Sequence, residues 1–89
     1  MDYEDWLNEQ LKDPEFRAEY EALEAEEELI QAVIDARKAS GLTEKQLAKK
    51  TGVKPSEVRN IESGKTELSL RMLQVLAGAM NMKLELVPA

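Results

Sequence analysis

The stretch TEKQLAKKTGVKPSEVRNIESGK, Thr43 to Lys65, decides the fold. Thr43 and Gln46 have the spacing of a capping box, so a helix is expected to begin there. Gly52 accepts the left-handed backbone conformation that ends such a helix, and Pro55 suits the first position of the next one. The stretch therefore predicts two short helices that meet through a tight turn.

A long helix is predicted before this stretch. Asp13 is a good N-cap and Pro14 fits the first helical position, and apolar residues then recur at helical spacing as far as Ser40. Four of the five residues 24–28 are Glu, which leaves two alternatives open, a solvated part of one helix or a break between two. The apolar spacing in DYEDWLNEQL, residues 2–11, predicts a short separate helix.

Ser69 is predicted to cap a further helix, and Asn81 to end it. Its expected buried stripe is Leu70, Leu73, Leu76, Ala77 and Met80.

The segment after that helix alternates apolar and charged residues, with Met82, Leu84 and Leu86 on one side. This alternation predicts a short, half-buried β-strand. Because the chain offers no second strand, we expect 82–86 to pair with a second copy and to form a homodimer.

The composition excludes several classes of function. The chain has no Cys and no His, so it lacks thiolate chemistry and the commonest general base and metal ligand. No Gly-rich phosphate loop is present either, and we expect no enzyme activity, no metal and no cofactor. No apolar run is long enough to span a membrane, and the acidic N-terminus does not have the form of a signal peptide. A cytoplasmic protein with no membrane partner is expected.

Charge divides the chain into two unequal parts. Residues 1–30 hold 12 acidic and 2 basic side chains, whereas residues 31–89 hold 6 acidic and 10 basic ones. The basic part suits phosphate groups, and the acidic part suits a basic protein because DNA would repel it. We therefore expect two different partners.

These observations predict an all-α fold of about five helices with one short C-terminal β-strand. We divide it into an acidic, helical, partner-binding extension (1–28), a helix-turn-helix domain (29–81) and a dimerisation strand (82–89).

The central part of the chain resembles the phage repressor/Cro (XRE-type) helix-turn-helix family. The matching residues are Leu42-Thr43, Gln46-Leu47-Ala48, Gly52-Val53, Val58 and Ile61-Glu62-Ser63-Gly64-Lys65. The resemblance implies DNA binding with the second helix in the major groove. It implies base contacts from Lys54, Pro55, Ser56, Arg59 and Asn60, and phosphate contacts from Lys45, Lys49, Lys65 and Thr66. It also implies a partly buried, structural ion pair between Arg37 and Glu62.

All four aromatic residues lie in the first 20 positions: Tyr3, Trp6, Phe16 and Tyr20. Two interpretations stay open. The rings either cover the outside of a small core, or they form an interface with a basic protein.

A second resemblance concerns the order of the parts. LKDPEFRAEYEAL (11–23), then the helix-turn-helix, then MKLEL (82–86) is similar to HigA-type antitoxins. This resemblance implies two partners, a small basic RelE-like (HigB-type) mRNA-cleaving toxin and a palindromic double-stranded operator. The toxin-binding residues would be Tyr3, Asp5, Trp6, Leu7, Glu9, Glu15, Phe16, Glu19, Tyr20 and Leu23. The alternative is a stand-alone XRE-family transcriptional repressor with no toxin partner.

Overall fold

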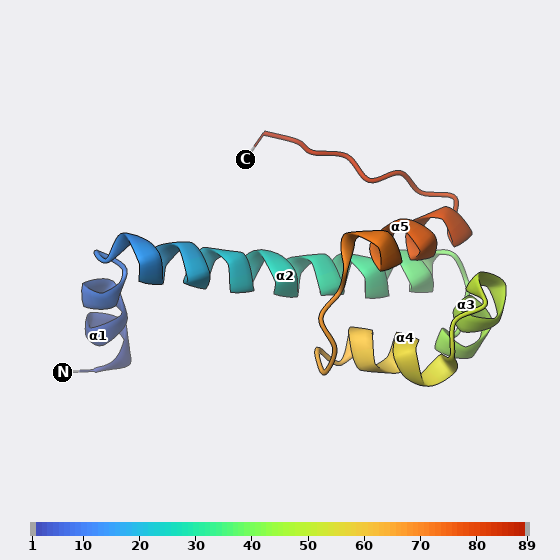
Figure 1. Cartoon of the computed structure of the whole chain (residues 1–89), viewed down its shortest axis with the longest axis horizontal. Coiled ribbons are helices and arrows are strands. Elements are labelled where there is room, and N and C mark those ends of the chain that lie inside the picture. Colours follow the sequence, from blue (N-terminus) through green and yellow to red (C-terminus); the bar gives the residue numbers. More distant parts are fainter. Residues whose placement is uncertain (1, 89) are drawn as a thin grey trace.

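A computed structural model of the chain describes residues 2–88, so Met1 and Ala89, the outer ends of the predicted segments 1–28 and 82–89, lie outside the described residues. Its five helices are α1 (Tyr3–Gln10), α2 (Pro14–Ala39), α3 (Glu44–Thr51), α4 (Pro55–Glu62) and α5 (Leu70–Ala79) (Figure 1). The predicted all-α class is confirmed. Within residues 2–88, no helix is both long and apolar enough to cross a membrane.

Local chemistry sets the helix ends. The Asp13 side chain accepts a hydrogen bond from the Glu15 N–H, and α2 then runs for 26 residues without a break. The Glu-rich residues 24–28 are therefore a solvated part of one helix. At α3 the Thr43 and Gln46 side chains each accept a hydrogen bond from the other residue's backbone N–H. Gly52 ends that helix with φ 75°, a left-handed conformation that glycine adopts without strain.

The core lies among the second half of α2 and helices α3 to α5. α3 packs against α4 and α5, and α2 packs against α4. Leu47, Val58 and Leu76 are completely buried, one from each of the last three helices. The predicted stripe of α5 is wrong at one position, since Leu70 is 67% exposed. Leu70 is the first residue of α5, where no neighbouring helix covers it.

The molecule is elongated because its N-terminal part stands clear of this core. The radius of gyration is 15.9 Å, against about 12 Å for a compact domain of this length. Figure 1 shows the first half of α2 projecting from the bundle, with α1 at its free end and at a steep angle to it. α1 contributes no buried residue.

The predicted C-terminal strand is wrong for the chain by itself. Residues 82–88 form no strand, and within the described residues no other segment is a strand. Leu86 is fully exposed, and Met82 and Leu84 are only about half covered. An extended segment becomes a strand only when a neighbour pairs with its backbone groups, and this tail passes over helices instead.

Candidate nucleic-acid interface and acidic leader

Helix α4 presents a polar face to solvent. Val58 and Ile61 are buried, and the 3.6-residue period then places Ser56, Arg59 and Asn60 on the outward side. Ser56 and Arg59 are exposed, and Asn60 is half-buried.

The start of α4 is open as well. Lys54 occupies the N-cap position and makes no capping hydrogen bond with its side chain, and Pro55 is the first helical residue. Both are exposed. The N-terminal turn of α4 therefore offers a cation, a ring and a short hydroxyl side chain next to one another.

Helix α3 continues this surface. A shallow hollow of about 350 Å³ joins the two helices, and its lining residues are Lys45, Gln46, Lys49, Val53 and Pro55. Gln46 and Val53 were not predicted to belong to this surface. The side-chain oxygen of Gln46 is engaged in the capping box, and Val53 also packs against the core. The sequence around these two residues does not indicate that they also line this hollow.

The loop after α4 holds the remaining predicted contacts. The carbonyl oxygen of Asn60 accepts hydrogen bonds from the N–H groups of Lys65, at 2.9 Å, and Thr66, at 3.3 Å. Gly64 makes the turn possible with φ 77°. The exposed side chains of Lys65 and Thr66 are therefore carried by a backbone that is fastened to α4.

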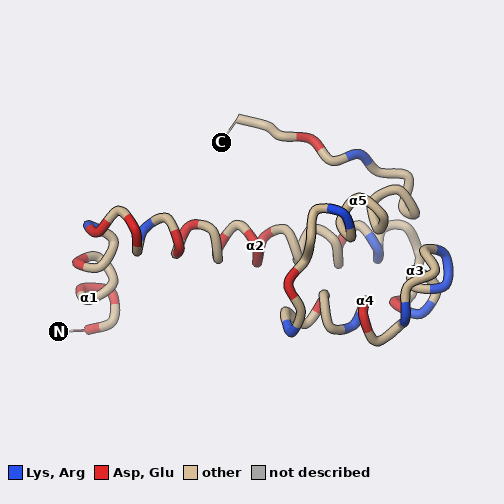
Figure 2. The backbone as a smooth tube through the Cα atoms, in the orientation of Figure 1, with Lys and Arg blue, Asp and Glu red and all other residues tan. Residues whose placement is uncertain are grey.

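Charge separates along the molecule. Figure 2 shows basic residues around α3 and the loops beside α4, and acidic residues along α1 and the first half of α2. Among residues 2–88 the ion pairs are Lys12–Glu9, Arg17–Glu21 and Arg37–Glu62. The lysines and the arginine predicted to contact DNA take part in none of these, so they are available to phosphates and bases.

Arg37 joins three parts of the domain. Its Nε donates to Glu62 Oε2 at 2.8 Å and its Nη2 to Glu62 Oε1 at 2.9 Å, while its Nη1 donates to the Leu42 carbonyl at 2.9 Å. The two side chains are only 11% and 8% exposed. Hydrogen bonding to Glu62 raises the pKa of Arg37 against the opposing effect of burial, and the charge of Glu44 also raises it. This bidentate pair fixes the end of the long helix to the end of α4.

Aromatic rings hold the leader together, where "leader" denotes α1 and the first half of α2, residues 2–28. Trp6 is edge-on to Phe16, with ring centroids 6.0 Å apart, and lies 6.0 Å from Tyr3. Phe16 stacks with Tyr20 at 6.4 Å. None of the four rings belongs to the core cluster, so the interpretation that they cover the core fails. Tyr3 remains 67% exposed and Trp6 43%.

The other predicted leader residues surround these rings. Leu7 is half-buried and Leu23 is 61% exposed. The carboxylates of Asp5, Glu9, Glu15 and Glu19 are on exposed residues, and Glu9 is paired with Lys12 at 3.0 Å.

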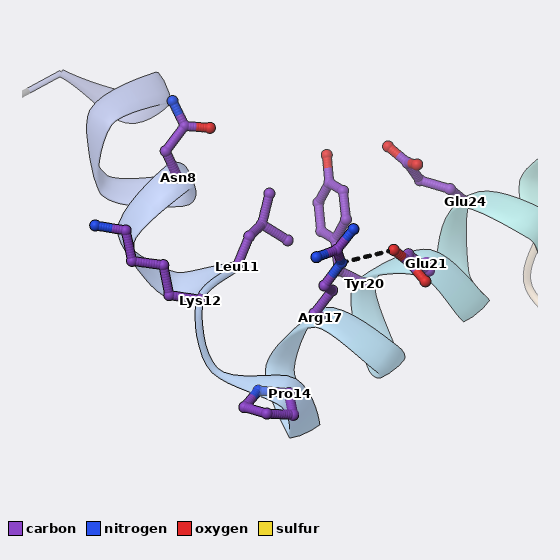
Figure 3. Close-up of a pocket in the computed structure, with 8 residues that line it drawn as sticks. All are labelled: Asn8, Leu11, Lys12, Pro14, Arg17, Tyr20, Glu21 and Glu24. Carbon is purple, nitrogen blue, oxygen red and sulfur yellow. Dashed lines mark hydrogen bonds and ion pairs between the residues drawn. The ribbon is translucent and has the colours of Figure 1, made fainter.

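The elbow between α1 and α2 encloses a hollow (Figure 3). Leu11 and Tyr20 line it, with the Arg17–Glu21 ion pair beside them. Side-chain hydrogen bonding with Glu24, and then its charge, raises the pKa of Tyr20.

The comparison with known proteins covers the domain and leaves out the whole leader. A family model described as helix-turn-helix matches residues 33–87, which is more than half of the chain. Neither the curated proteins nor the solved structures give a match. The matched range begins in the second half of α2 and includes α3, α4, α5 and most of the tail.

Proposed function

The chain belongs to the XRE-type helix-turn-helix family of DNA-binding regulators, and we propose that it serves as the antitoxin of a type II toxin–antitoxin pair. In this proposal it represses its own operon through α3 and α4, and neutralises a small, basic, RelE/HigB-like mRNA-cleaving toxin through its leader. It is a binding protein without enzymatic activity, and it acts in the cytoplasm, where operon and toxin are found.

The DNA-binding half of the proposal rests on α4. We place α4 in the major groove, where Arg59 and Lys54 suit guanine and Asn60 suits adenine. Pro55 and Ser56 approach the neighbouring bases. Lys45 and Lys49 on one side, and Lys65 and Thr66 on the other, suit the phosphates that flank the groove.

One observation carries the antitoxin assignment. The leader is acidic, bears all the aromatic rings and stands clear of the DNA-binding core. A regulator that binds only DNA gains nothing from a segment that repels phosphate, whereas a basic RNA-cleaving protein offers it a complementary surface. We propose that its carboxylates occupy the toxin's phosphate-binding cations. Trp6, Phe16 and Leu23 then fill apolar grooves beside them.

The test is rescue of growth. We expect a small basic reading frame next to this gene. Expressed from an inducible promoter, its product should stop growth, and the full chain should restore it. Trp6→Ala and Phe16→Ala should each weaken toxin binding by about 2 kcal/mol, roughly 30-fold in Kd, because hot-spot aromatic residues contribute about that much. Isothermal titration of the purified pair measures it.

Two controls accompany the rescue experiment. Arg59→Ala should leave toxin binding unchanged, because Arg59 lies on the outward face of α4. Circular dichroism of the leader variants shows whether the helices remain. If neither aromatic substitution changes the affinity, the leader is not the toxin-binding segment. If the neighbouring frame has no effect on growth and does not bind, the chain is a stand-alone repressor.

We also propose that the protein is a homodimer in which residues 82–86 of two chains pack together. Met82 and Leu84 line an apolar hollow with Leu29 and Leu73, while Leu86 remains uncovered in the single chain. A two-fold dimer would space two α4 helices by about 34 Å, one turn of DNA, on a palindromic operator.

Deleting residues 82–89 should therefore give a monomer with poor operator affinity. Light scattering after size-exclusion chromatography measures the mass, and fluorescence anisotropy measures operator binding. Leu70→Ser, which removes another exposed apolar side chain at the far end of α5, is the control and should stay dimeric. A truncated chain that remains dimeric would show that another surface holds the two copies together.

A further inference from the structure

A continuous, mostly apolar face runs along α2 from the leader into the DNA-binding domain. Side chains that recur at alternating spacings of four and three residues share one side of a helix. This "α2 seam" consists of Phe16, Tyr20, Leu23, Glu27, Ile30 and Ile34. From Phe16 to Ile34 the seam covers 19 residues, a rise of about 27 Å, enough to align five turns of a second helix.

The last part of the seam opens into a groove on the DNA-binding domain. The groove, about 420 Å³, lies between α2 and the end of α4, where Glu62, Ser63 and Gly64 close its other side. Ile30 and Ile34 are half-buried, and neither is among the side chains packed against the core. Leu23 is 61% exposed at the other end. These aliphatic side chains therefore have no established partner within residues 2–88.

The charges beside the groove indicate which kind of partner would bind in it. Glu26 and Glu27 border the groove, and neither takes part in an ion pair of the described chain. A second copy of this chain would bring its own acidic seam against them, and like charges oppose that contact. A helix with an apolar stripe and Lys or Arg beside it satisfies both the aliphatic floor and the acidic rim.

We infer that the α2 seam, together with the groove beside Ser63 and Gly64, is a docking surface for a basic amphipathic helix of a partner protein. The inference rests on the proposed function, because the toxin is the basic partner. It extends that contact from the leader onto the DNA-binding domain, as far as the loop that carries Lys65 and Thr66.

The first test uses a synthetic probe. An 18-residue peptide with leucines at alternating four- and three-residue spacing and Lys and Arg elsewhere, cross-linked so that the helix is preformed, is titrated into the ¹⁵N-labelled full chain. Amide signals of Leu23, Ile30 and Gly64 should shift, and less so as salt rises. A peptide with Glu in place of Lys and Arg should leave them unmoved. No shift, or shifts confined to residues 2–11, would overturn the inference.

Paired substitutions locate the contact. Leu23→Glu replaces an apolar contact of the seam with a charged group, and Glu27→Lys places a charge of the same sign opposite the basic peptide; each should weaken peptide binding about tenfold or more. Ala25→Glu and Glu28→Lys make the same changes on exposed residues away from the seam, and should have little effect. Equal effects within each pair would mean a diffuse charge attraction and no docking surface. A change of oligomeric state with Leu23→Glu alone would assign the seam to a second copy.

Different results would contradict this inference and the proposed function. If the neighbouring basic protein neither stops growth nor binds, but the peptide docks on the seam, the antitoxin assignment fails and the surface stands. If the full chain rescues growth while Leu23→Glu and Glu27→Lys leave toxin affinity unchanged, the antitoxin assignment stands and the toxin does not use the seam.

Discussion

Replacing Glu62 by alanine should lower the free energy of unfolding by about 3–5 kcal/mol, the usual cost of removing one partner of a buried ion pair. In the native structure the Arg37 side chain is only 11% exposed, and the substitution removes the two hydrogen bonds of 2.8 and 2.9 Å that Glu62 accepts from it. A domain of this size has about 5–15 kcal/mol in total, so the loss is a large share. Urea unfolding followed by circular dichroism measures it.

Glu57→Ala is the matched control. Glu57 lies on the same helix but is exposed and makes no ion pair among residues 2–88, so its removal should cost below about 1 kcal/mol. Glu62→Gln should fall between the two, since it keeps the shape and one acceptor. Similar losses for Glu57→Ala and Glu62→Ala would show that the buried pair contributes no more than a surface charge.

The pH dependence of this difference has a defined sign. Glu62 raises the pKa of Arg37 above its unfolded-state value, so the stabilisation is fully present below that unfolded value. The stabilisation is lost only as the pH rises through the pKa of Arg37 in the folded state, which is higher still and far above neutrality. The gap between the native chain and Glu62→Ala should therefore stay constant from pH 7 to moderately alkaline conditions.

Signals of fixed local spacing were readable from the sequence alone. The Thr43–Gln46 capping box, the Asp13-Pro14 helix start and the glycine at Gly52 each depend on backbone groups a few residues away. The residue types and spacing that such interactions need can be recognised within a few positions of sequence. Arg37 and Glu62 are 25 positions apart, and no periodicity joins them. That pair was expected only because the chain resembles a known family.

Features that depend on contacts with distant parts of the chain, or with another chain, could not be predicted from local sequence patterns. Apolar and charged residues alternate over residues 82–86 with the period of a strand. This period shows which side chains share a face, but it does not show which segment would pair with the strand. Leu70 has the hydrophobicity of a core residue but lies where α5 has only begun. The groove along α2 was missed because Ile30 and Ile34 have the spacing of core residues, and only the packing shows that they stay outside the core.

The double substitution Arg59→Ala with Asn60→Ala should remove about half of the free energy by which the protein prefers the operator. A side chain that reads one base edge contributes about 1–3 kcal/mol of discrimination, so the two together contribute about 2–6 kcal/mol. Specific binding exceeds non-specific binding by about 4–10 kcal/mol in such proteins, so this loss removes about half of the difference. Both side chains lie on the outward face of α4, so the fold should survive. Anisotropy titrations with a duplex selected from the upstream region, and with a scrambled duplex, measure the two affinities.

Lys49→Ala separates base reading from phosphate binding in the same assay. Lys49 is exposed on α3 beside the hollow that leads to Pro55, so we assign it to the backbone of the DNA. Its loss should weaken binding to both duplexes alike and reduce the slope of log K against log salt by about 1. Lys12→Ala removes the same charge from the leader and should change neither quantity. If the α4 double variant behaves like Lys49→Ala, losing affinity equally for both duplexes, then α4 contacts phosphates and the sequence is read elsewhere on the domain.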